Sequence, residues 1–130
     1  MSDLHYLTLA ALLTWVMVIS AALWRVGALG PVGLTRAFGN RADLPEVSPA
    51  CARADRAAKN MLENLLLFVV VLVAARLGGA GADALTPGAA LFFWARLAYW
   101  PIYVAGIAYL RTLVWLTSVC GLLWIAIAGW

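Results

Sequence analysis

Four long apolar segments constrain the fold of this chain more than any other feature of its sequence. They cover residues 5–29, 49–77, 84–110 and 112–130. A helix that crosses the hydrocarbon core of a bilayer needs about 20 residues, because each residue adds about 1.5 Å. Every segment is long enough, although the second reaches that length only when its polar first half is included. We therefore expect an all-α, integral membrane four-helix bundle.

The composition favours the same class of protein. The chain has 130 residues, of which 65% are hydrophobic and 12% are charged, whereas about a quarter of the residues in a soluble domain are charged. This length suits one domain, so we expect a single membrane domain over residues 1–130. The first segment lacks a basic start and is long enough to span, so we do not expect a cleaved signal peptide. Two cysteines, Cys51 and Cys120, are too few for a disulfide framework, and we expect no metal site.

The distribution of charge predicts how the chain is oriented. The net charge is +3, and most of the basic residues lie in or beside the connection over residues 30–48. Arg111 adds a basic residue at the third connection, near residues 109–112, whereas the N-terminus carries Asp3 and no Lys or Arg. Because Lys and Arg mark cytoplasmic loops, we expect these two connections in the cytoplasm and both termini on the opposite side. We expect no nucleic-acid partner, since no soluble basic face is available to bind a phosphate backbone.

The second segment is unusual because its first half is polar. Arg53, Arg56, Asn60 and Glu63 follow one another at spacings of three, four and three, so they fall within an arc of roughly 80° on one face of a helix. The wholly apolar part, residues 65–75, is about 16 Å long, which is half of a hydrocarbon core of about 30 Å. Because charged groups are costly in lipid, this polar stripe must face protein or a water-filled cavity.

The third segment carries a matching polar face. Arg96, Tyr99 and Tyr103 are spaced by three and four, and Arg96 lies well inside an apolar run. An unpaired arginine at that depth costs several kcal/mol. Glu63 is the only acidic residue in the interior of any apolar segment. We therefore predict a structural ion pair between Glu63 and Arg96.

Plainer interpretations of these residues stay open. Glu63 and Arg96 are also explained if they only fix the register of two helices. The basic residues at the start of the second segment are also explained if they extend to the membrane surface and contact anionic lipid. The tyrosines and tryptophans are mostly expected to pack or to anchor the helices at the interface. The tryptophans concerned are Trp94, Trp100, Trp115, Trp124 and Trp130.

Two blocks of polar residues have the spacing of a known family signature. The first block reads Arg-x-x-Arg-x-x-basic-Asn-x-x-Glu, here Arg53, Arg56, Lys59, Asn60 and Glu63. The second reads Arg-x-x-aromatic-x-x-x-Tyr with a later Arg, here Arg96, Tyr99, Tyr103 and Arg111. Together they resemble the MAPEG family (membrane-associated proteins in eicosanoid and glutathione metabolism), and the resemblance covers most of the chain.

The resemblance implies a MAPEG-like bundle that assembles as a homotrimer and binds glutathione. Glutathione would lie between neighbouring subunits near the cytoplasmic side. The cofactor-binding residues implied are Arg53, Arg56, Asn60, Glu63, Tyr99 and Tyr103. Arg111 is the implied catalytic residue, because a nearby cation favours the reactive thiolate, and Thr112 beside it is expected to donate a second hydrogen bond.

Two functions from different classes follow from this resemblance. The first is a glutathione S-transferase or peroxidase that acts on hydrophobic electrophiles or lipid hydroperoxides. The alternative is a non-catalytic accessory or scaffold subunit that binds lipids, pigments or a larger membrane protein complex. A transporter is disfavoured, because the sequence has no inverted repeat. In either case we expect a protein of the bacterial inner membrane whose partners are its own copies and membrane lipids.

Overall fold

The chain folds into helices, four of them long. The computed structural model describes residues 1–27, 30, 32–39 and 46–130, and contains no strand among them. This confirms the expected all-α four-helix class. The helices are α1 (Asp3–Val26), α2 (Gly33–Phe38), α3 (Pro49–Leu77), α4 (Ala82–Ala105) and α5 (Ala108–Ala128).

Three helices, α1, α3 and α5, are long and apolar enough to cross a membrane. α4 is as long as α1, but Arg96 and two prolines lie within it, and it does not reach the same hydropathy. The expectation that α4 also crosses the membrane therefore stays a prediction.

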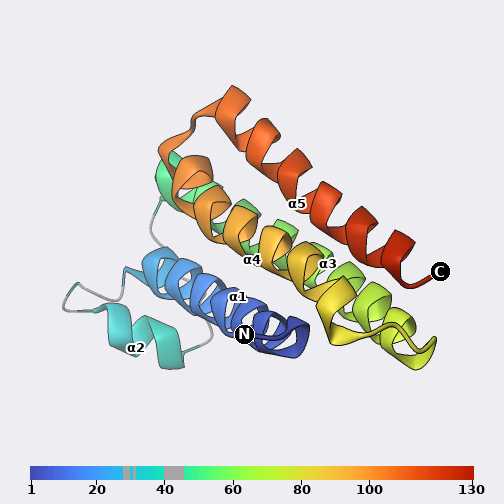
Figure 1. Cartoon of the computed structure of the whole chain (residues 1–130). Coiled ribbons are helices and arrows are strands. Elements are labelled where there is room, and N and C mark those ends of the chain that lie inside the picture. The colour runs from blue at the N-terminus through green and yellow to red at the C-terminus, as the bar shows by residue number, and fades with distance from the viewer. Residues whose placement is uncertain (28–29, 31, 40–45) are drawn as a thin grey trace.

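The four long helices lie side by side, and successive helices run in opposite directions (Figure 1). α3 and α4 each contact all three of the other long helices, whereas α1 and α5 have no contact with each other in the described part of the chain. α5 therefore flanks one side of the bundle and α1 the other. Both termini lie at one end, and the α4–α5 connection lies at the opposite end.

The helix ends show where local sequence sets the fold. α3 begins at the expected residue 49, where Ser48 Oγ accepts a hydrogen bond of 3.2 Å from the Cys51 N–H and Pro49 occupies the first helical position. α4 ends earlier than the expected residue 110. Gly106 adopts the left-handed conformation with φ 84°, and its N–H bonds back to the last turn of α4. The break thus lies at residues 106–107 rather than 109–112.

Part of the connection over residues 30–48 is helical. The structure places the short helix α2 (Gly33–Phe38) within it, in contact with α1. Residues 28–29, 31 and 40–45 lie outside the described residues.

The core lies between the four long helices, and Leu122 and Ile125 are the buried residues that α5 contributes to it. Phe68 and Phe92 stack with their ring centroids 4.2 Å apart at the centre of this core. α4 and α5 approach closely at Gly88 and Gly121. A Cβ on Gly121 would lie 2.7 Å from the Gly88 carbonyl oxygen, so a larger residue there would force the two helices apart.

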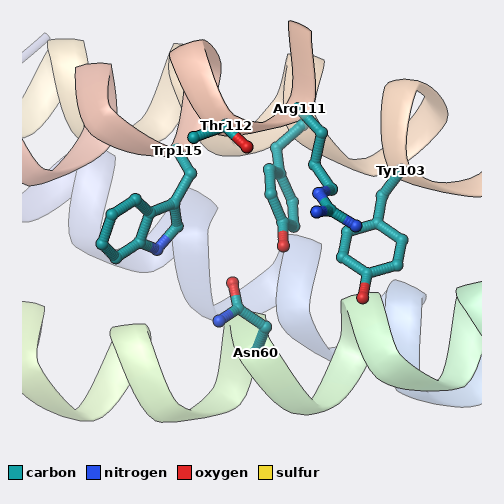
Figure 2. Close-up of a pocket in the computed structure, with 6 residues that line it drawn as sticks. Asn60, Tyr103, Arg111, Thr112 and Trp115 are labelled. Carbon is teal, nitrogen blue, oxygen red and sulfur yellow. The ribbon is translucent and has the colours of Figure 1, made fainter. Parts of the chain in front are cut away.

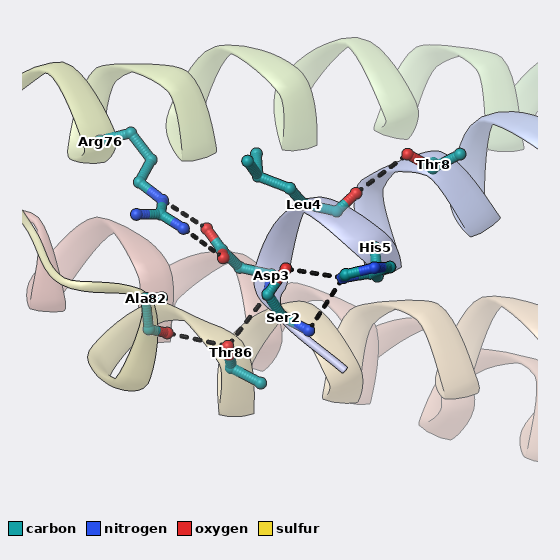
Figure 3. A network of polar contacts seen from close by, with 8 residues as sticks. All are labelled: Ser2, Asp3, Leu4, His5, Thr8, Arg76, Ala82 and Thr86. Carbon is teal, nitrogen blue, oxygen red and sulfur yellow. Dashed lines mark hydrogen bonds and ion pairs between the residues drawn. The ribbon is translucent and has the colours of Figure 1, made fainter.

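A polar cluster joins three helices at the end of the bundle that holds the termini (Figure 3). Asp3 is fully buried and accepts two hydrogen bonds from Arg76, 2.7 Å from Nε and 2.6 Å from Nη2. The Asp3 N–H also donates to Thr86 Oγ1 at 3.0 Å. We call Asp3, Arg76 and Thr86 the N-terminal clip, because they tie the start of α1 to the end of α3 and the start of α4.

Candidate functional site

A polar pocket of about 280 Å³ lies between α3, α4 and α5, near the end of the bundle that holds the α4–α5 connection. α3 contributes one residue to its wall, α4 contributes two, and α5 contributes three, and Figure 2 shows how their side chains lie. The lining residues are Asn60, Tyr99, Tyr103, Arg111, Thr112 and Trp115.

Helical spacing brings these side chains together. Tyr99 and Tyr103 lie one turn apart on α4, and their rings meet edge to face with centroids 5.3 Å apart. Arg111 and Trp115 lie one turn apart in the first turns of α5. The Arg111 guanidinium carbon lies 4.9 Å from the centroid of the Tyr103 ring, a cation–π contact that holds the positive charge beside the pocket.

Thr112 differs from its expected role. Its Oγ1 donates a hydrogen bond of 3.1 Å to the Ala108 carbonyl oxygen within α5. The hydroxyl proton is therefore used inside the helix, and Thr112 presents an acceptor oxygen rather than the expected second donor.

Arg96 lies fully buried behind the pocket, and its partner is not the predicted one. Its Nη1 donates a hydrogen bond of 2.8 Å to Asn60 Oδ1. The predicted ion pair with Glu63 is not formed in the chain: the Glu63 side chain is exposed, and no hydrogen bond or ion pair joins the two residues. Glu63 lies roughly 60° further around α3 than Asn60, which turns it away from α4.

Arg53 makes a contact that the sequence did not predict. Its Nε donates a hydrogen bond of 2.8 Å to the Val104 carbonyl oxygen in the last turn of α4. A Cβ on Gly106 would lie 3.4 Å from the Arg53 guanidinium carbon. Arg53 thus caps the C-terminal end of α4 and fixes the start of the α4–α5 connection.

The predicted binding residues therefore divide into two groups. The pocket gathers Asn60, Tyr99, Tyr103 and Arg111. Arg56 and Glu63 are exposed on the outer face of α3 and do not line the pocket, and Arg53 is engaged at the end of α4.

Trp115 is a pocket residue that the sequence analysis treated as packing or interface anchorage. The spacing in the sequence could have identified it, because Trp115 follows Arg111 by four residues and so shares a helix face with it. The contact between Asn60 and Arg96 was also missed, because only acidic residues were considered as partners for a buried arginine.

Comparison with known proteins identifies a family for nearly the whole chain. The model of the MAPEG family matches residues 4–129, nearly the whole chain. No curated protein matches the chain.

Proposed function

This chain belongs to the MAPEG family and is an integral membrane protein, and we propose that it is a glutathione-dependent transferase or peroxidase. Its substrates are hydrophobic electrophiles or lipid hydroperoxides. The observation that carries this proposal is the polar pocket, which places the Arg111 guanidinium beside Asn60 and two tyrosines and has no acidic residue among the described residues that line it.

The pocket residues fit glutathione chemically. Glutathione has two carboxylates and a thiol that reacts as the thiolate. Arg111 supplies a permanent positive charge, and the Tyr103 ring holds it in place. A nearby cation lowers the free energy of a thiolate relative to the thiol. When bound, glutathione supplies the sulfur that forms a bond to the electrophilic carbon as the leaving group departs with its electron pair.

The position of the pocket suits a lipid-soluble second substrate. α5 has no contact with α1, and the residues that follow Arg111 expose apolar side chains such as Leu113 and Leu116. A hydrophobic electrophile then reaches the Arg111 side of the pocket from the bilayer, without crossing water.

The proposed assembly is a homotrimer. Arg56, Lys59 and Glu63 are exposed on the outer face of α3, where contact with lipid costs several kcal/mol for each buried charge. A second copy of the chain that covers this face removes that cost. It also brings Arg56 and Glu63 of one copy to an interface, so their predicted binding roles depend on assembly.

The proposed membrane is the bacterial inner membrane, with both termini on the non-cytoplasmic side. The polar pocket lies at the end opposite the termini. This orientation therefore places the pocket toward the cytoplasm.

Isothermal titration of the purified protein in detergent with millimolar glutathione tests the proposal. We expect saturable binding and turnover of a model electrophile by the wild type, and a loss of turnover of at least tenfold for Arg111→Ala. Arg111→Lys is the matched control, because it keeps a positive charge beside the pocket and loses only the planar guanidinium, and it should retain more turnover than Arg111→Ala. Absence of binding, together with equal turnover of all three proteins, would exclude the enzyme.

The second candidate is a non-catalytic accessory or scaffold subunit that binds lipids, pigments or a larger membrane complex. The observation that favours it is the aromatic outer surface, where Trp15, Trp94 and Trp124 are each more than half exposed. Native mass spectrometry of the gently solubilised protein separates the two functions. A stable larger assembly or a bound pigment, without turnover, supports the accessory role, whereas a free homotrimer with turnover supports the enzyme.

A further inference from the structure

We infer that Arg96 is a positioning residue for the polar pocket. It binds Asn60 Oδ1 and so leaves Asn60 Nδ2 as a donor in a fixed orientation. The pocket therefore selects a ligand that places an anionic acceptor group, a carboxylate or a thiolate, against Asn60. The use of glutathione as the probe of this inference rests on the proposed function.

The hydrogen bond between Arg96 and Asn60 determines which end of the Asn60 amide is available. A guanidinium carries only donors, so it binds the oxygen of an asparagine amide and not its nitrogen. Arg96 Nη1 lies 2.8 Å from Asn60 Oδ1, which fixes the orientation of the planar amide. The group that Asn60 has left to offer a ligand is therefore the two N–H bonds of Nδ2.

Arg96 has no other polar contact that explains its burial. Its Nε and Nη2 atoms are buried and have no hydrogen-bond partner in the described structure. The guanidinium carbon lies 5.5 Å from the centroid of the Phe92 ring and 5.2 Å from that of Tyr99. A buried charge with so few partners contributes little to stability. Its one hydrogen bond goes to a residue that lines the pocket, and this links Arg96 to the ligand site.

The rest of the pocket also favours an acceptor group. The Arg111 guanidinium and the Trp115 indole N–H are donors only, and none of the described residues that line the pocket is a carboxylate. The hydroxyl proton of Thr112 is used within α5, so Thr112 adds no donor to the pocket. With Asn60 Oδ1 bound to Arg96, α3 offers the N–H groups of Nδ2 and α5 offers the donors of Arg111 and Trp115. Among these residues an ammonium group has no anionic partner.

The test measures glutathione affinity by isothermal titration for Arg96→Met, Arg96→Lys and Asn60→Asp. Arg96→Met removes the donor that orients the amide, and we expect an affinity loss of about tenfold, the usual effect of one hydrogen bond to a charged group. Arg96→Lys keeps a donor for Oδ1 and should recover most of the affinity. Asn60→Asp keeps an acceptor for Arg96 but replaces Nδ2 with an oxygen, so binding should fall at least tenfold while thermal stability does not decrease.

A double-mutant comparison separates positioning from general damage. In an Asn60→Ala background, Arg96→Met should change glutathione affinity less than twofold, because the amide that it orients is gone. An equal loss in both backgrounds, or wild-type affinity for Asn60→Asp, overturns the inference. S-methylglutathione identifies the acceptor: the effect of Arg96→Met persists with this probe if the acceptor is a carboxylate and disappears if it is the thiolate.

A second measurement keeps the inference separate from the proposed function. If the wild type does not bind glutathione, the proposed function fails. NMR of protein labelled with ¹⁵N-asparagine still reports on the Asn60 side-chain amide, whose signals are assigned by their loss in Asn60→Asp. Faster rotation of this amide in Arg96→Met supports the orienting role of Arg96, and unchanged rotation overturns it.

Discussion

Two regions of the bundle, the N-terminal clip and the surroundings of the polar pocket, each bury one charged side chain completely, but with different partners. In the N-terminal clip, Asp3 is 0% exposed and both of its carboxylate oxygens accept hydrogen bonds from Arg76. Behind the polar pocket, Arg96 is equally buried but donates one hydrogen bond, to the neutral amide of Asn60, and two of its nitrogen atoms have no partner among the described residues.

The difference indicates that buried Asp3 stabilises the fold, whereas buried Arg96 positions a residue of the pocket. Removing one member of a buried ion pair leaves the other charge without compensation, which strongly destabilises a protein. Removing a buried charge that has few partners removes its desolvation cost as well as its hydrogen bond. Asp3 and Arg96 should therefore respond in opposite ways to mutation, although both are fully buried.

Arg76→Ala should have the largest effect on stability. It leaves the Asp3 carboxylate buried without a cation, so we expect the free energy of unfolding in detergent to fall by about 3 kcal/mol. Arg76→Lys is the control, because it keeps the charge and loses the two-bond geometry, and it should cost about 1 kcal/mol. Unfolding followed by circular dichroism measures both. Wild-type stability of Arg76→Ala would show that the N-terminal clip does not form in the membrane-like environment.

Asn60→Leu should have an intermediate effect. It takes away the acceptor of the Arg96 hydrogen bond and leaves the guanidinium with no polar partner. We expect a loss of about 2 kcal/mol in the same unfolding measurement. Asn60→Asp, which keeps an acceptor for Arg96, serves as the control and should be at least as stable as the wild type. Equal stability of Asn60→Leu and Asn60→Asp would show that the Arg96 guanidinium donates a hydrogen bond to an acceptor other than Asn60.

Arg96→Met should change stability by less than about 1 kcal/mol, because an incompletely paired buried charge is replaced by an apolar chain of similar length. The informative comparison is the double variant with Asn60→Leu, which should be more stable than Asn60→Leu alone. A loss of about 3 kcal/mol for Arg96→Met, the size expected for a broken buried ion pair, would place Arg96 in the same class as the N-terminal clip and remove the distinction between the two regions.

Glu63→Gln should have the smallest effect. The side chain is exposed and has no partner among the described residues, so the free energy of unfolding of the dissociated chain should change by no more than about 0.5 kcal/mol. The measurement uses a detergent concentration that separates any oligomer. A destabilisation of 2 kcal/mol or more, on the order expected for a broken buried pair, would support the predicted Glu63–Arg96 ion pair after all.

Sequence predicted the parts of the molecule that depend on local pattern. The four apolar segments correspond to the four long helices, and α3 spans residues 49–77 as expected. The spacing of Tyr99 and Tyr103 placed both on one face of α4, and the structure gathers them with Asn60 and Arg111. Helical periodicity carries this information, because residues three or four apart share a face in any helix.

Contacts between distant segments were not predictable in the same way. Asp3 and Arg76 are 73 positions apart, and no periodicity relates them. The partner of Arg96 was missed because complementary charge was the criterion, whereas a neutral amide oxygen was the nearer acceptor. The end of α4 was missed because hydrophobicity continues past Gly106, and only the backbone conformation of that glycine ends the helix.

The location of both termini beside the same end of α3 has a practical consequence. Asp3 contacts Arg76, and Trp130 and Ala75 line the same cavity. Met1 and Trp130 therefore lie at the same end of the bundle. Reporters fused to the two termini of one chain must occupy the same compartment. Two halves of a split fluorescent protein attached there should reassemble, leaving the opposite end of the bundle free of any tag.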